Sequence, residues 1–333
     1  MSILQIIAQD GSMRRKILLI KCKGGLGNRI LSAVCGLIYA DLSGRTPVID
    51  WRDGSYAPLG DNAYPLLFNT PIKSSCAEID KAVCPVAPAI WTGYLTASTQ
   101  DMINKFMPKA HSSPKAYRVF CVDLEDLNVP EDIAVYWSYL PKFRRLTKHI
   151  RRDPRFTGRS IPCIIKEYLD RYFTPNVRVG REVTRLTAQL GANPIGIHVR
   201  YTDRKIPLNS ALSILRKRLM QVPDQPIFLA TDNAHVQRKM KMEFANLYHI
   251  NKHLPDNGER LHWPATDVAK LLEAENALID MWVLSKCTRL IYSRQSTFSQ
   301  TSVYLGNMAR NQLDDVDRNS PKVLLKQLIQ YYA

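Results

Sequence analysis

Apolar residues along the chain follow two patterns, those of buried strands and of amphipathic helices. Residues 16–22 (KILLIKC) form a short apolar run that is typical of a buried strand. Beyond a glycine-rich segment, apolar residues recur at helical spacing over 30–42, and residues 46–50 (TPVID) again have the length and composition of a strand. This order of strand, glycine loop, helix and strand is that of a βαβ unit, so the chain opens as an α/β protein.

The same alternation returns, more regularly, in the second half of the chain, and it predicts a parallel, doubly wound sheet. The predicted strands are 195–200, 226–231, 247–250 and 289–293. The predicted helices are 161–172, 179–190, 208–220, 234–245, 266–286, 297–309 and 324–332. We therefore expect two α/β domains, residues 14–190 and residues 191–333, each large enough to bury a core of its own.

Residues 51–160 have a weaker pattern than either flank. Prolines interrupt this region repeatedly, and strand-like segments stand out only near 118–122 and 133–139. We interpret the region as the variable part of the first domain, with long surface loops of the kind that often hold a second substrate.

Positive charge is the most unusual feature of the composition. The formal net charge is +16, which favours acidic partners such as phosphates, nucleic acid or an anionic membrane face. The densest basic stretch extends from Lys142 to Arg159 and contains a single acid, Asp153. It is either a solvated face or loop, or a patch that meets an anionic lipid or a polyanionic acceptor. Aromatic residues are not interleaved with these cations and no RNA-binding signature is present, so we expect no nucleic acid as partner.

The cysteines and histidines predict neither a disulfide framework nor a metal site. The seven cysteines are odd in number and no pair has CxxC spacing, while Cys22 and Cys35 lie on the first predicted strand and helix. No Cys/His cluster has the spacing of metal ligands. No apolar run reaches the ~18 residues of a membrane span, and residues 1–13 do not have the pattern of a signal peptide. These features favour reduced thiols in a cytoplasmic protein.

Two segments place polar groups where a strand ends. Residues 24–29 (GGLGNR) join the first strand to the first helix, and their glycines permit either a tight turn or close approach of a phosphate to helix N–H groups. Residues 196–205 (GIHVRYTDRK) carry His198 and Arg200 on one strand face, at the carboxyl end where ligands bind in open α/β sheets. Arg200 can contact a diphosphate through two N–H groups at once.

Two later segments repeat this arrangement. Residues 228–233 end in Asp232 and Asn233, either of which is a suitable helix N-cap. In residues 280–299, Asp280 is a carboxylate on an otherwise apolar helix face, and a carboxylate can accept two N–H bonds from the edge of guanine. A turn rich in Ser and Thr then opens the last of the regular helices, where side chains can cap the helix or its free N–H groups can bind phosphate. The residues concerned are Ser296, Thr297 and Ser299.

Taken together, these motifs resemble the fucosyltransferase superfamily, which includes α-1,6-fucosyltransferases, protein O-fucosyltransferases and plant cell-wall fucosyltransferases. The most specific likenesses are His198-Val-Arg200 with Thr202-Asp203, and the block from Asp280 to Ser299. Residues 44–56 (GRTPVIDWRDGSY) and 62–65 (NAYP) are most similar to the bacterial nodulation-factor (chitin-oligosaccharide) α-1,6 branch. The resemblance extends over most of residues 17–307.

The resemblance implies a two-domain GT-B-like fold, with an acceptor-side N-terminal domain and a Rossmann-like C-terminal domain that binds the nucleotide sugar. It implies an enzyme that transfers fucose from GDP-fucose to a carbohydrate or glycolipid acceptor, with inversion and without metal or cofactor. Such an enzyme would act in the cytoplasm, with possible contact at the inner membrane face through the basic stretch. By position, Arg200 matches the arginine of the donor β-phosphate, and His198 and Asp280 match guanine contacts. The remaining donor-side positions are Gly27, Asn28, Ser296, Thr297, Phe298 and Ser299.

The chain departs from the family pattern in two places. Tyr201 stands where the α-1,6 branch often has a second arginine, and residues 205–210 lack the acid expected after the Thr-Asp pair. Asp203 is therefore the candidate general base beside Arg200, with a base from the first domain or a dissociative cleavage of the donor as alternatives. Three other interpretations stay open: a glycosyltransferase for another nucleotide sugar, a basic nucleic-acid-binding protein, and a lectin-like relative without activity.

Overall fold

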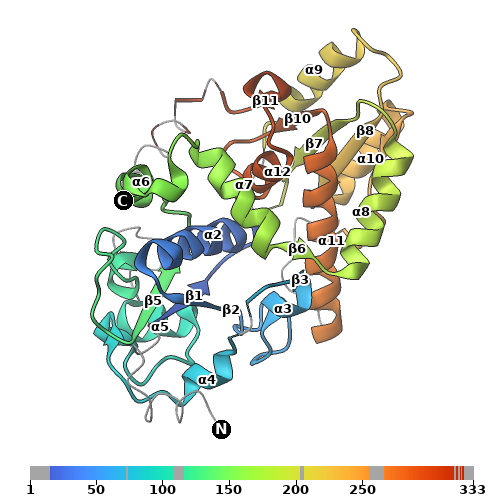
Figure 1. Ribbon diagram of the computed structural model, residues 1–333. Helices are drawn as coiled ribbons and strands as arrows, with labels where there is room; N and C mark the ends of the chain where they lie inside the picture. Colours follow the sequence, from blue (N-terminus) through green and yellow to red (C-terminus); the bar gives the residue numbers. More distant parts are fainter. Residues whose placement is uncertain are drawn as a thin grey trace.

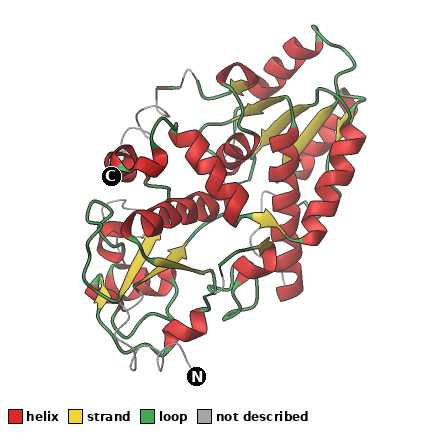
Figure 2. Cartoon of the chain, in the orientation of Figure 1, coloured by secondary structure: helices red, strands yellow, loops and turns green. Residues whose placement is uncertain are grey.

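The computed structural model describes residues 16–72, 74–108, 116–202, 206–254, 266–318, 320–321, 323 and 325. These residues form a mixed α/β structure around two separate parallel sheets (Figures 1 and 2). In the first sheet the strand order is β2-β1-β5-β4, and in the second it is β11-β10-β7-β8-β9. The strands β3 and β6 pair antiparallel between them. The strands of the first half are β1 (Ile17–Cys22), β2 (Thr46–Asp50), β3 (Phe68–Asn69), β4 (Val86–Ala87) and β5 (Ile133–Ser138).

Helices surround and separate the sheets. Those of the first half are α2 (Leu26–Ser43), α3 (Ala63–Leu67), α4 (Cys76–Asp80), α5 (Thr99–Phe106), α6 (Phe143–Arg152) and α7 (Ile161–Tyr172). The rest are α8 (Val177–Leu190), α9 (Leu208–Leu219), α10 (Ala234–Glu243), α11 (Asp267–Lys286) and α12 (Thr297–Gly306). The second-half strands are β6 (Thr174–Pro175), β7 (Ile195–Val199), β8 (Ile227–Thr231), β9 (Leu247–Tyr248), β10 (Arg289–Tyr292) and β11 (Leu313–Asp315). Short 3-10 turns are η1 (Ala89–Trp91), η3 (Ala116–Phe120), η4 (Pro154–Phe156) and η5 (Arg310–Gln312).

Each sheet has one face toward a shared interior and one toward outer helices, because side chains alternate along a strand. On β1, Leu18 and Ile20 join the central hydrophobic cluster, whereas Leu19 joins a second cluster on the outer face of the first sheet. The central cluster also contains Leu284 of α11 and Leu290 of β10, so it is continuous from one half of the chain to the other. In Figure 1 the helices α2, α7, α12 and α11 lie between the two sheets.

Helix α2 lies at the centre of this interior. Its residues from Leu26 to Ala40 are all buried, which is the pattern of a helix enclosed on every side and not of a surface helix. The helix contacts β1 below and α7 and α12 above. It ends at Gly44, whose φ of 67° is left-handed and favours glycine.

Most predicted elements are confirmed within a few residues, and the exceptions have physical reasons. The strand expected near 118–122 is wrong: η3 turns there, Phe120 is buried, and the Val122 N–H alone reaches the Val135 carbonyl of β5. The basic stretch forms α6, because Leu146 and Ile150 give it a narrow buried stripe. Of the helix expected at 324–332, only Leu325 is among the described residues. The domain boundary at 190/191 stays a prediction; α8, just before it, packs along α11.

Candidate functional site

A cleft opens where the carboxyl ends of both sheets face each other. Residues that directly follow β1, β5, β7 and β8 line it, as open α/β sheets favour for ligand sites. Its empty space is about 1140 Å³, counting the open mouth. The first half of the chain contributes Gly25, Gly27, Asn28, Tyr56 and Tyr139. The second half contributes His198, Arg200, Asp232, Lys252, Asp280 and Phe298, among others.

His198 is a buried, neutral histidine at the end of β7. Its ring stacks on Phe298 at a centroid distance of 4.7 Å, and its Nδ1 lies 2.6 Å from the Ser299 hydroxyl. Burial, together with the nearby charges of Arg200 and Lys252, lowers the pKa of His198 to about 3. The ring is therefore uncharged at neutral pH, and because Nδ1 is bonded to Ser299, Nε2 is the nitrogen left for a ligand.

The neutral state of His198 predicts a loss of stability in acid. The pKa of His198 falls from 6.5 to about 3 on folding. Between these two pH values the imidazole is therefore protonated in the unfolded chain and neutral in the folded chain. Stability should fall as pH drops from 6.5 toward 3, by up to about 1.4 kcal/mol per pH unit from this group. Urea unfolding at several pH values should show this slope for wild type and for His235→Gln, an exposed histidine, and a shallower slope for His198→Gln. Equal slopes in all three would contradict the assignment.

Arg200 is the next cleft residue along the chain, directly beyond β7. Its positive charge reaches Tyr56 on the opposite wall, since Arg200 is among the charges that act on the pKa of that phenol. Asp232 holds the backbone after Arg200 in place. It accepts hydrogen bonds from the Tyr201 N–H and from the Thr202 hydroxyl, each at 2.7 Å. The N-cap of α10 is Asn233, which accepts from the Val236 N–H at 3.1 Å. Asp232 is thus a loop-positioning residue of the cleft.

Asp280 is a deeply buried carboxylate on α11. Its Oδ2 accepts from the Lys252 ammonium at 2.5 Å, while its Oδ1 is buried and has no hydrogen-bond partner among the described residues. Burial raises the pKa of Asp280, and the Lys252 ammonium opposes that rise. A buried acceptor without a partner is costly, so this oxygen suits a ligand that brings N–H donors.

The N-terminal ends of α2 and α12 meet at the floor of the cleft. Gly25 precedes α2 without any side-chain cap, and Ser296 caps α12 by accepting from the Ser299 N–H at 3.5 Å. The side-chain oxygen Oδ1 of Asn28 accepts a hydrogen bond from the Thr297 hydroxyl, and this bond joins the two helices. The N-terminal ends of both helices, each at the positive end of a helix dipole, therefore line the same cleft.

Gly27 makes this contact possible. A Cβ placed there would lie 2.4 Å from the Phe298 amide nitrogen and 2.5 Å from the Thr297 carbonyl carbon, which are backbone atoms that cannot rotate away. Gly27→Ala should therefore destabilise the protein by about 1–3 kcal/mol through overpacking, although Gly→Ala inside a helix is ordinarily favourable. At Gly25 a Cβ would meet nothing within 4 Å, so Gly25→Ala is the matched control. Equal unfolding free energies for the two variants would contradict the close contact.

The opposite wall of the cleft rests on a buried arginine. Arg29 donates from Nε to the Gly24 carbonyl at 2.8 Å and from Nη2 to Asp53 at 2.5 Å. Its guanidinium also lies 5.0 Å from the centroid of the Tyr56 ring, which lines the cleft. No sequence pattern singled out Arg29, although Asp53 and Tyr56 belong to the segment at 44–56 that carries the family resemblance.

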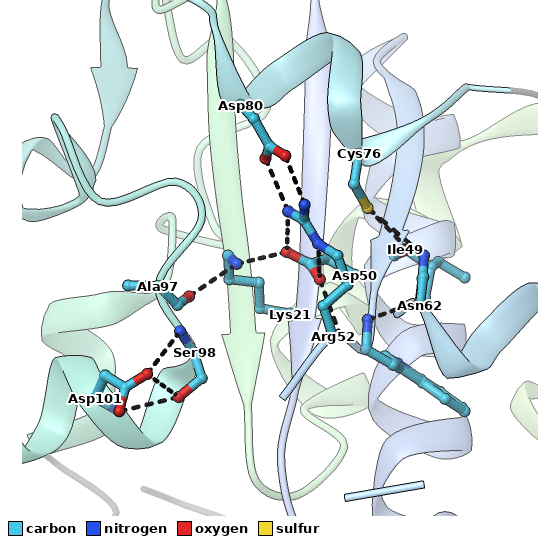
Figure 3. Close-up of polar contacts among 11 residues, drawn as sticks. Lys21, Ile49, Asp50, Arg52, Asn62, Cys76, Asp80, Ala97, Ser98 and Asp101 are labelled. Atoms are coloured by element: carbon cyan, nitrogen blue, oxygen red, sulfur yellow. Dashed lines mark hydrogen bonds and ion pairs between the residues drawn. The ribbon is translucent and has the colours of Figure 1, made fainter. Parts of the chain in front are cut away.

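A second network lies at the carboxyl ends of β1 and β2 and includes Asp50 and Arg52, in the middle of that segment (Figure 3). Lys21 and Asp50 are partners across the strand pair, with their charged atoms 2.6 Å apart. Arg52 donates to Asp50 and, through two nitrogens, to Asp80 at 2.6 and 2.8 Å. Because these charged groups satisfy one another, we interpret the network as a structural support for residues 51–56.

The structure brings most of the predicted site residues together. Gly27, Asn28, His198, Arg200, Asp280, Thr297 and Phe298 line the cleft. Ser299 lies behind His198 and Ser296 caps α12, so neither is a lining residue. Asp203 lies outside the described residues. Sequence reasoning missed Lys252 and Glu273; the position of Lys252 just beyond β9, at the same sheet edge, was the available signal.

Within the part of the chain that the structure describes, no group of three or more His, Cys, Asp or Glu side chains has the arrangement of a metal site. Across those same residues, no helix combines the length and the apolar character that crossing a bilayer requires.

No family model matches the sequence, and no curated protein does. The fold does match solved structures. The α-1,6-fucosyltransferase NodZ, soaked with GDP-fucose, gives a TM-score of 0.63 at 18% identity over 87% of this chain and 93% of that one. NodZ from Bradyrhizobium gives a TM-score of 0.61 at 18% identity, with 86% and 91% covered. A variant of Arabidopsis thaliana FUT1 in complex with GDP gives a TM-score of 0.53 at 18% identity, with 92% and 72% covered. The chain therefore has the fold of these fucosyltransferases, the superfamily that its sequence motifs resemble.

Proposed function

We propose that the protein is a glycosyltransferase that moves fucose from GDP-fucose to a carbohydrate or glycolipid acceptor. The observation that carries this proposal is the cleft itself, where Asp280, His198 and Arg200 meet the N-terminal ends of two helices. Structures of NodZ with GDP-fucose and of FUT1 with GDP, which share the fold, support a GDP-linked donor.

The nucleoside end of the donor fits Asp280. Guanine offers two adjacent N–H donors, at N1 and at the exocyclic amine, and a carboxylate can accept both. Lys252 holds one Asp280 oxygen and leaves the other for the base. A carboxylate has acceptor sites beyond the one that Lys252 occupies, whereas uracil offers a single N–H at the corresponding edge. Guanine would therefore make one hydrogen bond more with Asp280, which favours GDP over UDP.

The diphosphate end fits Arg200 and the helix ends. A guanidinium binds phosphate oxygens through two parallel N–H bonds, and uncapped helix N–H groups add donors at the positive end of each dipole. Arg200 follows β7 at the cleft, and Gly27 and Phe298 bring the two helix ends beside it. This arrangement supplies positive charge where GDP would leave.

Transfer then follows from charge separation. In our proposal the acceptor hydroxyl attacks the anomeric carbon from the face opposite GDP, so the configuration inverts. A bond from the acceptor oxygen to that carbon forms, the bond to the β-phosphate oxygen breaks with its electrons, and the hydroxyl proton passes to a base. Arg200 and the helix N–H groups stabilise the charge on departing GDP. We propose Asp203 as this base. We also propose that GDP departs without the help of a metal ion.

An acceptor panel tests the proposal directly. The purified protein is incubated with GDP-fucose and a set of oligosaccharides and glycolipids, and transferred fucose is detected by mass spectrometry with and without EDTA. We expect one acceptor class to be fucosylated, EDTA to leave the rate unchanged, and GDP but not UDP to inhibit. Binding of UDP in preference to GDP, or absence of transfer to every acceptor class, would contradict it.

The basic stretch has a place in this proposal as a membrane contact. The sequence of α6 contains no acid, and its buried stripe is Leu146 and Ile150, so its cations face outward. Arg144, Lys148, Arg151 and Arg152 are exposed. We propose that this face meets anionic lipid at the inner membrane surface, where a lipid-linked acceptor would be found, because each cation near such a surface contributes about 1 kcal/mol.

Vesicle sedimentation tests the membrane contact. Wild type should bind phosphatidylglycerol vesicles and not phosphatidylcholine vesicles, and salt should release it. Replacing the four exposed α6 cations by Gln should abolish binding. A control with the same loss of charge elsewhere should bind normally, namely Arg181→Gln, Arg185→Gln, Arg216→Gln and Lys241→Gln. Equal binding by both quadruple variants would refute a specific role for α6.

A further inference from the structure

One face of α11 runs along the length of the cleft. Lys270, Glu273, Ala274, Ala277 and Asp280 all line it, and their spacing of three and four residues is that of a single helix face. Asp280 stands at the buried end of this face and Glu273 toward the start of the helix. Two alanines lie between them and leave room against the helix for a flat ligand. The face thus presents two carboxylates separated by a small, apolar surface.

The two carboxylates differ in what surrounds them. Asp280 is 2% exposed and is held by Lys252, whereas Glu273 is half-buried. Burial raises the pKa of Glu273; the charges of Lys252 and His253 oppose that rise, and Asp280 adds to it. These charges belong to the Asp280 end of the cleft. The charge of Lys252 acts on His198 as well. Glu273 therefore shares a helix face and the nearby Lys252 charge with Asp280, the residue proposed to bind the base.

Glu273 lines the cleft, and its neighbour on the same helix face has another partner. Lys270, one turn earlier on the same face, pairs with Asp267 at 2.8 Å. Glu273 and Asp280 are seven residues apart, which is about 10 Å along a helix, comparable with the length of a nucleoside from base to sugar. A carboxylate is a strong acceptor for a vicinal diol, and nucleotide sites on α/β folds use an acid on the ribose for this reason.

From this placement we infer that Glu273 is a specificity residue that accepts hydrogen bonds from the 2′- and 3′-hydroxyls of the donor's ribose. The inference rests on the proposed function, because it requires a nucleotide in this cleft. In this arrangement Asp280 selects the base and Glu273 selects the sugar of the same nucleoside. The alanines between them provide the surface along which the nucleoside lies.

Calorimetric titration tests the inference without any acceptor. GDP and 2′,3′-dideoxy-GDP are titrated into wild type, Glu273→Gln and Glu182→Gln, the last being the same change on α8, outside the cleft. A hydrogen bond to a charged group contributes enough that wild type and Glu182→Gln should bind GDP about tenfold or more tightly than the dideoxy ligand. Glu273→Gln should bind GDP about tenfold more weakly and should lose most of the discrimination between the two ligands.

The outcomes separate this inference from the proposed function. Equal affinity of wild type for GDP and dideoxy-GDP would overturn the role of Glu273 and leave the GDP site intact. Full discrimination by a folded Glu273→Gln variant would overturn it as well, since another group would then read the ribose. Failure of wild type to bind GDP at all would overturn both the proposed function and the inference.

Discussion

Arg200→Ala should lower turnover with GDP-fucose by at least about a hundredfold while the protein stays folded. The reason is that negative charge grows on GDP as the sugar bond breaks, and removal of one group that stabilises such charge typically costs about 2.7–4 kcal/mol of barrier. Arg200 lies at the carboxyl end of β7 in the second sheet, and the N-terminal ends of α2 and α12 line the same cleft. Its loss therefore removes the charged partner of the leaving group. Initial-rate measurements at saturating GDP-fucose, for wild type and Arg200→Ala, give the ratio of the two turnover rates.

The control for this prediction is another arginine. Arg216 on α9 is half exposed and pairs with Glu243, and it does not line the cleft. Arg216→Ala should keep wild-type turnover. Circular dichroism and unfolding midpoints should match wild type for both variants. A folded Arg200→Ala enzyme with near-normal turnover would remove Arg200 from the mechanism.

Asp280→Ala should both abolish GDP binding and destabilise the fold. It removes the carboxylate proposed to read guanine, and it leaves the Lys252 ammonium buried without its partner. Breaking a buried ion pair by removing one member typically costs about 3–5 kcal/mol. Urea unfolding and GDP titration on the same preparation measure the two losses.

A double variant separates these two roles of Asp280. Asp280→Ala combined with Lys252→Met removes both charges, so most of the lost stability should return. GDP binding should not return, because the acceptor for the base is still missing. Recovery of GDP binding in the double variant would show that Asp280 acts only as a partner for Lys252.

The regular parts of the fold could be predicted from local pattern. Three regions show this: the apolar run of β1, the helical spacing of α2 and the strand–helix alternation after residue 194. In each, the spacing of apolar residues along a short stretch of sequence is enough to predict which face is buried and which element forms. The middle region was harder, since α3, α4 and β4 span only two to five residues and depend on contacts elsewhere. Local propensity carries little information for such short elements.

The site was predictable only where its residues stand at the ends of regular elements. His198, Arg200 and Asp280 were found because a charged or polar group interrupts an apolar pattern. Arg29, Lys252 and Glu273 were not, because their roles arise from partners far along the chain, such as Asp53 and Asp280. The glycine loop was left open between a tight turn and phosphate approach, with Gly27 as a donor-side position, whereas the contact of Gly27 with Phe298 shows a packing requirement between the two halves.

A crystal structure with GDP tests the account most directly. We predict the guanine edge on the free oxygen of Asp280, the β-phosphate within hydrogen-bonding distance of the Arg200 guanidinium, and the ribose against α11. GDP bound at another surface, with the space between β7 and the start of α2 left to solvent, would contradict the account.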